Sequence, residues 1–523
     1  MSNNQQHIIR KQTLNLELFG MESQGLALQQ ELPQVIGQYI NPAIENVFNR
    51  YSSLQEYITI DYLEIDAGNL SFERLAQDLA GHVEQLLEKA LREKMLGIEF
   101  SSVLNQKEEE ISDTEGNVKL RTYSQSVRTA FIYFLRTGRL PWSFQLDEGK
   151  RLEDTILDAW QNLTPSQRLA WKADVRAALV DEDIRQRLVF QFSTAFLEKL
   201  LALLLPNAHQ ALSVLITLVN QLEVNSTDKK ILTQVFWQVI AKYMATHDAI
   251  NVHGAVNIKE VMQQIAALIP VRILTKNVLQ LTDFMKFFER YDVHLLPHHL
   301  NALESKDTAH QVRKSIRKAD SIINKSVNEN KHDAESGRMN GAHHKEARLL
   351  FDEVQDVKEG IYINFAGLVL LHPFLPQFFE VLGIVVNDEI VQPSRAVSLL
   401  HYLATGQRNA AEYELVLPKI LCNVPLSTPV ELEIEFTEAE MVQALKLLEA
   451  VISHWEVLNS TSVDGLRGTY LIRSGKLTLR EDADWLLQVE SKSYDILLGS
   501  LPWGFSMIQL PWMPKMLWVE WIN

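Results

Sequence analysis

One segment of this 523-residue chain, residues 305–348, differs sharply in composition from the sequence around it. It contains no Phe, Trp or Tyr. Its ten Lys or Arg against six Asp or Glu give +4, so the remainder of the chain, whose total is −16, carries −20. Five apolar residues at helical spacing occupy its first half: Val312, Ile316, Ala319, Ile323 and Val327. Residues 328–344 show no period. We therefore predict a charged helix and a flexible linker that join two larger parts.

Length, charge and hydropathy restrict the class of protein. A chain of 523 residues exceeds what one hydrophobic core usually serves, which favours several domains. The net charge of −16 argues against nucleic-acid binding, which needs clustered Lys and Arg. Residues 200–222 are interrupted by Pro206, and no run reaches the roughly 20 apolar residues of a spanning helix. Residues 1–10 lack an apolar signal region, so synthesis in the cytoplasm without membrane insertion is expected.

Alternating apolar residues near the N-terminus predict two strands. The first run is Leu14, Leu16 and Leu18, and the second is Ile58, Ile60 and Tyr62. Residues 33–52 between them predict a helix. Residues 1–70 are thus expected to form a small strand–helix–strand unit. Helical periods dominate from there on, so residues 71–304 are expected to form a helical domain.

Capping residues indicate where several helices begin and end. Thr164 followed by Pro165 is typical of an N-cap and the first helical position. Gly138 is a helix stop. Thr437 and Glu440 have the spacing of a capping box, which predicts a helix that begins there and runs to about residue 455.

Residues 349–523 are predicted to be a helical domain that ends in a small antiparallel sheet rich in Trp. The expected strands are residues 476–480, 485–490 and 505–510, which alternate or read as extended. The fold class predicted for the chain is mainly α with small β elements near both termini, an α+β protein of several helical domains.

Six of the ten tryptophans lie in this last part, at positions 455, 485, 503, 512, 518 and 521. Two interpretations remain open. The tryptophans pack a compact core, or some of them form a protein-binding surface, since Trp is enriched at interface hot spots. Under the second interpretation, the candidate partner-binding residues are Trp503, Trp512, Trp518 and Trp521.

No catalytic, cofactor-binding or metal-ligating residue is assigned. The sequence contains no phosphate-binding loop, dinucleotide fingerprint, H-E-x-x-H or G-x-S-x-G motif. His332, His343 and His344 have no accompanying set of Cys or carboxylates. Cys422 lies in an apolar run, where a buried inert thiol is expected and a reactive thiol is the alternative. An enzyme whose site escapes motif analysis remains a further alternative.

Two phrases on either side of the segment 305–348 are similar. Residues 134–142 and residues 402–407 each place an apolar helix ahead of a Thr-Gly stop. A duplicated helical unit and a shared way of ending helices explain this similarity equally well.

Several phrases in this order resemble one known family. They are residues 60–66, 137–142, 371–376, 395–406, 419–422 and 501–504. Together they resemble the contractile injection system tape measure family, over both ends of the chain but not over residues 305–348.

The resemblance implies a non-enzymatic structural protein that sets the length of the inner tube and sheath of a phage-tail-like particle. It implies inner tube and baseplate or spike proteins as partners, with self-association as a further expectation. The chain would be in the bacterial cytoplasm during assembly and later in the assembled extracellular particle. The sequence also departs from a simple extended ruler, because its 16 prolines and its strands indicate compact cores. The alternative is a cytoplasmic assembly chaperone or adaptor for tube, baseplate or cargo proteins.

Overall fold

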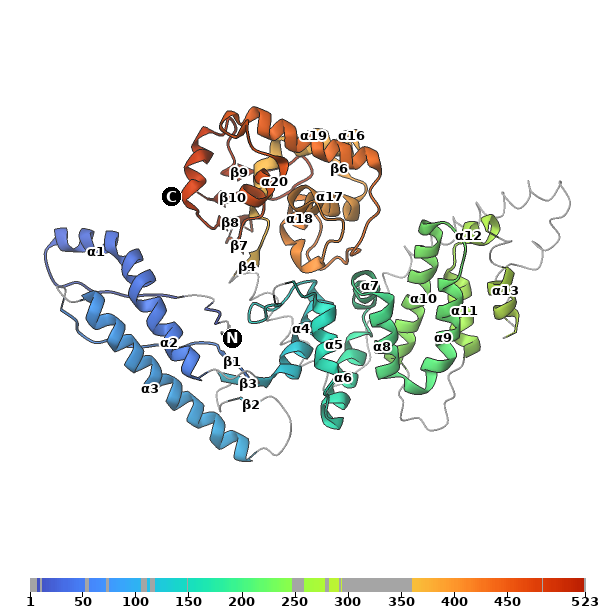
Figure 1. Cartoon of the computed structure of the whole chain (residues 1–523), viewed down its shortest axis with the longest axis horizontal. Helices are drawn as coiled ribbons and strands as arrows, with labels where there is room; N and C mark the ends of the chain where they lie inside the picture. The colour runs from blue at the N-terminus through green and yellow to red at the C-terminus, as the bar shows by residue number, and fades with distance from the viewer. Residues whose placement is uncertain are drawn as a thin grey trace. The chain divides into compact units, whose positions relative to one another are not determined.

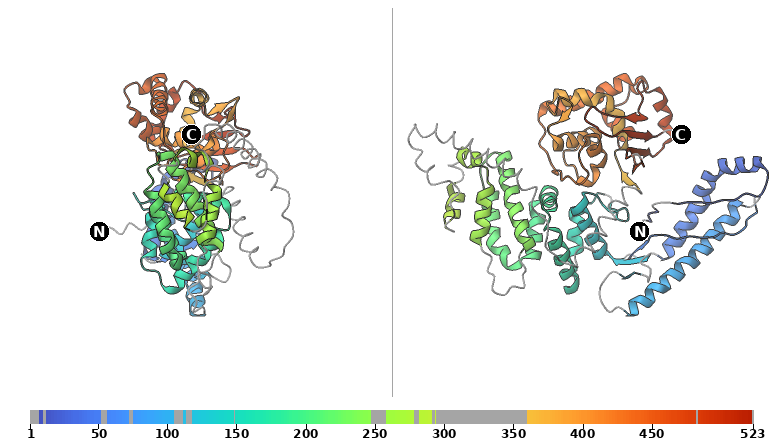
Figure 2. Two further views of the ribbon diagram at one scale, coloured as in Figure 1. Left: turned by 90° about the vertical axis from the view of Figure 1, so that its right-hand side faces the viewer. Right: turned by 180° about the vertical axis from the view of Figure 1, so that it is seen from behind.

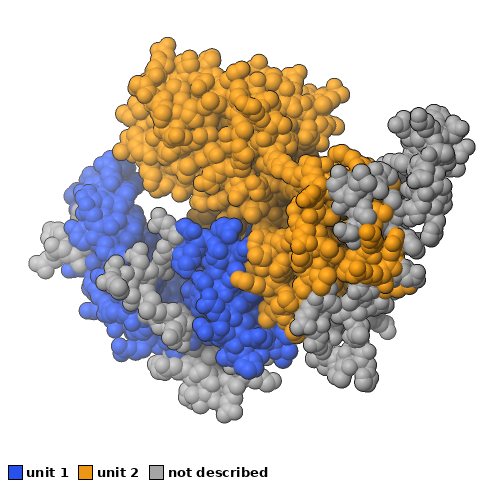
Figure 3. All heavy atoms as spheres, turned by 45° about the vertical axis from the view of Figure 1, so that its right-hand side comes forward, with its two compact units in different colours: residues 1–134, 140–173 blue, residues 135–139, 174–523 orange. Residues whose placement is uncertain are grey.

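The computed structural model describes most of the chain outside the predicted linker. The described residues are 7–9, 12–51, 56–71, 75–104, 111–112, 118–147, 149–246, 258–277, 282–290, 293, 360–481 and 483–521. The predicted helix and linker at 305–348 lie outside them. The chain forms two compact units, residues 1–134 with 140–173 and residues 135–139 with 174–523 (Figure 3). It is mostly helical, as predicted, whereas the predicted division into four parts stays a prediction.

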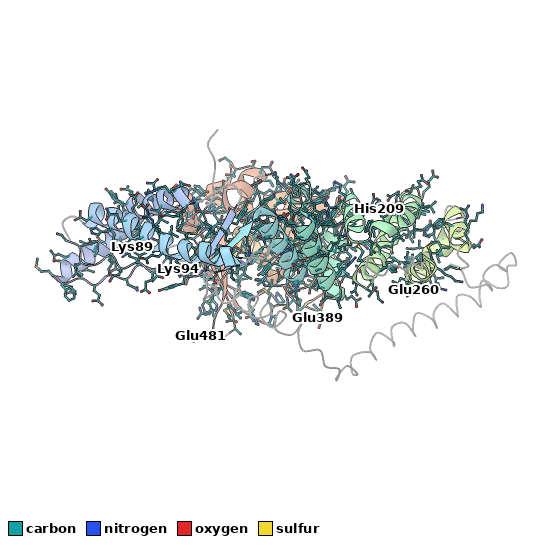
Figure 4. All side chains as sticks on the ribbon, turned by 90° about the horizontal axis from the view of Figure 1, so that it is seen from below. Lys89, Lys94, His209, Glu260, Glu389 and Glu481 are labelled. Carbon is teal, nitrogen blue, oxygen red and sulfur yellow. The ribbon has the colours of Figure 1, made fainter. Side chains whose placement is uncertain are left out.

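Unit 1 begins with two long helical stretches that run parallel to each other, which we call the helical pair. Helix α1 (Glu22–Val35), a π-helical turn (Ile36–Ile40) and α2 (Asn41–Tyr51) run without a break and pack against α3 (Leu75–Leu104) (Figure 1). Two small cores hold the pair together: Val35, Ile40, Leu79 and Val83 in one, and Val47, Leu87 and Leu91 in the other. Exposed charges such as Lys89 line the outside of α3 (Figure 4). The helix predicted at 33–52 is confirmed.

The first predicted strand is wrong. Residues 12–19 are extended but pair with no strand among the described residues, and Leu14 packs on the core formed by Val35 and Ile40 instead. The second predicted strand is confirmed as β1 (Glu56–Ile60). Its partner is β3 (Val118–Thr122), with Ile58 opposite Leu120, and β2 (Ile111–Ser112) pairs with the other edge of β3. Of the three leucines, only Leu14 packs on a helical core, whereas Leu16 and Leu18 are exposed.

The rest of unit 1 is built around Trp171. It lies on α6 (Pro165–Ala178), packs against Phe131 of α4 (Tyr123–Thr137) and Trp160 of α5 (Leu152–Trp160), and donates its indole N–H to Ser124 Oγ at 3.1 Å. The predicted cap is confirmed, since the Gln167 amide donates to Thr164 Oγ1 at 3.2 Å.

Further helices follow in unit 2, drawn in green in Figures 1 and 2. They are α7 (Glu182–Gln191), α8 (Thr194–Leu204), α9 (Pro206–Asn220), α10 (Ser226–Thr246), α11 (Ile258–Leu268), α12 (Val271–Lys276) and α13 (Thr282–Glu289). Pro206 divides the most hydrophobic stretch into α8 and α9, as expected. Among the described residues, no helix combines the length and apolar character needed to cross a membrane.

Residues 360–521 of unit 2 form one continuous hydrophobic core. Its helices are the 3₁₀ segment η4 (Ala366–Phe374), α16 (Leu375–Val381), α17 (Pro393–Thr405), α18 (Val416–Leu421), α19 (Glu438–His454), α20 (Val463–Leu466) and the π segment η7 (Arg467–Leu471). The capping box is confirmed at the start of α19, where Thr437 Oγ1 accepts from the Glu440 amide.

A five-stranded sheet covers one side of this core. Its order is β4 (Ile361–Ile363), β7 (Gly475–Leu479), β8 (Trp485–Val489), β10 (Leu517–Glu520) and β9 (Met507–Ile508). The prediction of a wholly antiparallel sheet is wrong, because β10 pairs with β8 in parallel. Parallel neighbours need a long crossover, and the chain supplies it between β8 and β10, including the 3₁₀ segment η8 (Ser493–Ser500). A separate hairpin joins β5 (Val385–Val386) and β6 (Glu389–Ile390).

We predict that Gly367→Ala destabilises the C-terminal core by about 3 kcal/mol, because a Cβ at this position would lie 1.8 Å from the Tyr470 carbonyl oxygen. Urea denaturation followed by Trp fluorescence measures the effect. The matched control is Gly468→Ala, whose Cβ meets nothing within 4 Å and which should change stability by less than about 1 kcal/mol. Equal denaturation midpoints for the two variants would contradict the packing argument.

Candidate functional site: a buried ionic junction

The stretch between α18 and α19 in unit 2 lies against α7 and α10. The Leu432 amide donates to the Phe190 carbonyl at 3.0 Å, and Gln191 Nε2 donates to the Val430 carbonyl at 2.6 Å. Residues on either side of the predicted linker are therefore in direct contact. We call this contact the junction.

The centre of the junction is Glu412, whose carboxylate is fully buried between two cations. Glu412 Oε2 accepts from Arg187 Nε at 3.0 Å, and Oε1 accepts from Lys419 Nζ at 2.6 Å. The side chains of Arg187 and Glu412 have no exposed area, and that of Lys419 is 2% exposed. The Glu412 amide donates to Gln191 Oε1 at 2.9 Å. Burying a charge is tolerated only when it is paired and hydrogen-bonded, and all three charges meet this condition.

Backbone carbonyls accept further hydrogen bonds from both cations. Arg187 donates to the carbonyls of Leu135, Arg136 and Ser427. Lys419 donates to the carbonyls of Leu426 at 2.8 Å and Thr428 at 2.7 Å. These oxygens come from the last turn of α4 and from the loop after α18. The two cations thus hold three separate stretches of the chain together.

The Thr-Gly phrase at the end of α4 has a direct part in this packing. Gly138 has a φ of 72°, as expected for a helix stop, and a Cβ there would lie 2.3 Å from Glu412 Oε1. The second phrase behaves similarly: Gly406 ends α17 with a φ of 73°, and a Cβ there would lie 3.0 Å from the Arg467 guanidinium. Each glycine therefore ends a helix and leaves room for a charged side chain. Both phrases therefore end helices, as predicted.

Burial also changes the protonation of the junction. It lowers the pKa of Lys419 from 10.5 to about 8; Glu412 opposes the shift, and Arg187 and Arg139 add to it.

A polar rim surrounds the buried charges where α10 meets residues 431–435. Lys230 pairs with Glu431 at 2.5 Å and donates to the Glu433 carbonyl at 2.7 Å, while Ser226 Oγ donates to Glu435 at 3.2 Å. Pairs of this exposure contribute little to stability. The buried charges therefore dominate the energetics of the junction.

The four candidate partner-binding tryptophans lie elsewhere, in the C-terminal core and its sheet. Trp512 and Trp521 are buried, whereas Trp503 and Trp518 are half-buried. Every indole N–H has an acceptor in the chain: Leu370 O for Trp503, Leu421 O for Trp512, Asp484 Oδ2 for Trp518 and Asp495 Oδ2 for Trp521. The structure does not bring the four together into one surface. Partner binding by them stays a prediction, with Trp503 and Trp518 the accessible members.

Trp518 lies on the outer face of the sheet. Across the strands, Trp518 is paired with Leu486 of β8 on one side and with Met507 of β9 on the other; Met507 is 57% exposed. The Arg480 guanidinium lies 5.2 Å from its ring centroid. The ring is therefore covered in part by an arginine that a partner would have to displace.

The described residues contain no group of three His, Cys, Asp or Glu side chains arranged to hold a metal ion. The histidines at 298, 299, 332, 343 and 344 lie outside the described residues. His372 is half-buried, with a pKa lowered by burial, and its Nδ1 is 2.9 Å from the Val369 carbonyl. Burial raises the pKa of the Cys422 thiol, which favours the inert interpretation over the reactive one.

Fold and site together show a mostly helical protein in which buried charges fasten helices to a mixed α/β core. Over residues 6–521 the chain matches the family described as contractile injection system tape measure protein. The chain belongs to this family, which confirms the resemblance seen in the sequence. The family is structural, and its members determine the length of the tube of a contractile injection particle. Comparison with curated proteins and with solved structures found no match.

Sequence analysis did not find the junction. Arg187 and Glu412 are 225 positions apart, and neither lies in a motif. Two phrases that carried the resemblance, at 137–142 and 419–422, do supply parts of it, Gly138 and Lys419. In the sequence, these phrases indicated the family but not that their residues would meet at the junction.

We predict that Glu412→Gln lowers the free energy of unfolding by about 3 kcal/mol, because it leaves two buried cations without a counter-charge. Chemical denaturation of the full chain measures this. Glu449→Gln removes the same charge from an exposed position of α19 and should change stability by no more than about 0.5 kcal/mol. Equal denaturation midpoints for the two variants would show that the junction does not stabilise unit 2.

The lysine predicts a pH dependence as well. Because the pKa of Lys419 is about 8 in the folded chain and 10.5 in the unfolded chain, the unfolded chain binds more protons between these values. The contribution of Lys419 to stability should therefore rise with pH from about 8 to 10.5, by at most about 1.4 kcal/mol per pH unit. Across this pH range, the denaturation midpoint of the natural chain should rise relative to that of Lys419→Met. Parallel profiles would contradict the assignment.

Proposed function

We propose that this tape measure protein acts as a compact folded body, held together by the junction, rather than as an extended rod. The observation that supports this is the junction. It ties the helices before the predicted linker to the domain after it, through contacts between α7 and residues 412–432. While the junction is closed, the described residues before and after the segment 305–348 belong to one compact unit. Lengthening that segment would then not lengthen the unit.

In this proposal, the chain limits tube growth from a fixed position, by association with the tube lumen and baseplate. Its partners are the inner tube and baseplate or spike proteins, with no nucleic acid and no membrane insertion. The strongly negative charge of −16 supports basic or amphoteric partner surfaces. The chain carries out no catalysis, is in the bacterial cytoplasm during assembly and is retained in the extracellular particle.

A second candidate function is a cytoplasmic assembly chaperone or adaptor that never enters the particle. The observation that favours it is the continuous core of residues 360–521, with fully buried Trp455 and Tyr470, which is typical of a domain that works in its folded state. Such a core is an unnecessary feature for a chain that works only when stretched.

Particle length separates these functions. We expect that deleting or doubling residues 328–344 in the producing cell leaves particle length unchanged, whereas removing the whole chain makes lengths heterogeneous. Negative-stain electron microscopy gives the lengths, and mass spectrometry of purified particles shows whether the chain is present. Length that follows the segment would establish an extended ruler. A chain absent from finished particles would move the assignment to the chaperone.

A further inference from the structure

An apolar surface is exposed at the start of the helical pair of unit 1. Phe19 is 92% exposed, more than any other large hydrophobic side chain among the described residues. Its neighbours are also exposed: Leu16 40%, Leu18 38%, Met21 68% and Leu26 59%. We call these five residues the N-terminal tip. Helix α1, which carries part of it, lies at the far end of the helical pair from β1 and β3 (Figures 1 and 2).

Contacts within unit 1 fix the backbone of the tip. Leu14 packs on the core of Val35 and Ile40 and so anchors the extended residues that lead to the tip. A Cβ on Gly25 of α1 would lie 3.7 Å from Leu18, which shows that the extended residues run close beside the helix. The Met21 amide donates to Gln24 Oε1 at 3.0 Å. These contacts fix the backbone and leave the apolar side chains outside.

The cap of α1 breaks a local rule in the same place. The residue before the helix is Met21, whose side chain makes no capping hydrogen bond, although Ser, Thr, Asp and Asn are strongly preferred there. A polar cap would stabilise the helix and remove apolar surface from water. Local rules are broken mainly at functional sites, and here the gain is one more exposed apolar side chain.

The charged residues of the tip segment are acidic. Residues 12–30 contain no Lys, Arg or Asp and two Glu, Glu17 and Glu22. Both side chains are exposed. An acidic rim around apolar residues complements an apolar pocket rimmed by basic residues and repels an acidic one. A second copy of a chain with a net charge of −16 is a poor match.

We propose that the N-terminal tip docks into an apolar pocket rimmed by Lys or Arg on a partner protein. Phe19 is the anchor, since a buried aromatic side chain is the usual centre of a binding hot spot. Met21 and Leu26 add adaptable apolar contact, and Glu17 and Glu22 pair with the basic rim. The proposal rests on the proposed function only for the choice of particle proteins as the place to look.

Photo-crosslinking in the full chain tests this docking. Phe19 is replaced by p-benzoyl-phenylalanine, and the crosslinked peptides are identified by mass spectrometry, both in producing cells and in purified particles. Val180, 70% exposed in unit 2, receives the same group as a control for apolar exposure. We expect position 19, and not position 180, to crosslink to a peptide of a particle protein that carries apolar residues flanked by Lys or Arg.

Charge reversal tests the basic rim. Glu17→Lys with Glu22→Lys should reduce the crosslink from position 19 at least fivefold, whereas Glu260→Lys with Glu481→Lys, two exposed positions labelled in Figure 4, should leave it within twofold. Circular dichroism should show the same melting for all variants, because the changed side chains are exposed.

Crosslinks from position 19 only to this chain or to a second copy, or no crosslink, would overturn the proposal. So would equal yields after the two charge reversals. Failure of the proposed function is visible separately, as absence of the chain from purified particles. Docking in the producing cells would still be detected in that case.

Discussion

The burial of Glu412 between Arg187 and Lys419 is the constraint on which the second unit depends. A carboxylate without exposed area has no water to stabilise it, so the two cations and their carbonyl acceptors must all be in place together. The junction is therefore specific. Its surroundings are polar, with Lys230, Glu431 and Glu435 at the rim. Separated surfaces of this kind would be readily hydrated, so the junction suits a contact that closes in one defined way rather than a permanent apolar core.

This constraint relates the architecture to the role of the family. A ruler measures by its extension, yet this chain forms contacts that bring residues distant in sequence together. The hydrogen bond between Leu432 and Phe190 and the ion pair between Arg187 and Glu412 make one body of stretches that an extended ruler would keep apart. Length control by such a body depends on where it is held and on what it touches. Surfaces such as the N-terminal tip are then as important as the number of residues.

What the sequence predicted well depended on a few neighbouring residues. Thr437 with Glu440, Thr164 with Gln167, and Gly138 act within four positions, so their caps and stops could be predicted without knowledge of the fold. The features that were missed depend on pairing across the chain. The partner of β1, the parallel pair of β8 and β10, and the contact of Arg187 with Glu412 are all of this kind. Alternation identifies a strand but not its neighbour, and a charged residue in sequence gives no sign that it is buried.

The position of β10 has a consequence for how the protein is made. It lies between β8 and β9, so the sheet has a gap in its interior until the chain has been synthesised beyond Glu520. On the ribosome, the earlier strands must wait with an open edge while the helices of unit 1 and the first helices of unit 2 can already fold. A chain that stops early cannot close the sheet, and the core that presents Glu412 and Lys419 stays incomplete. Such a fragment would expose an unpaired strand edge, which can pair with other chains and lead to aggregation.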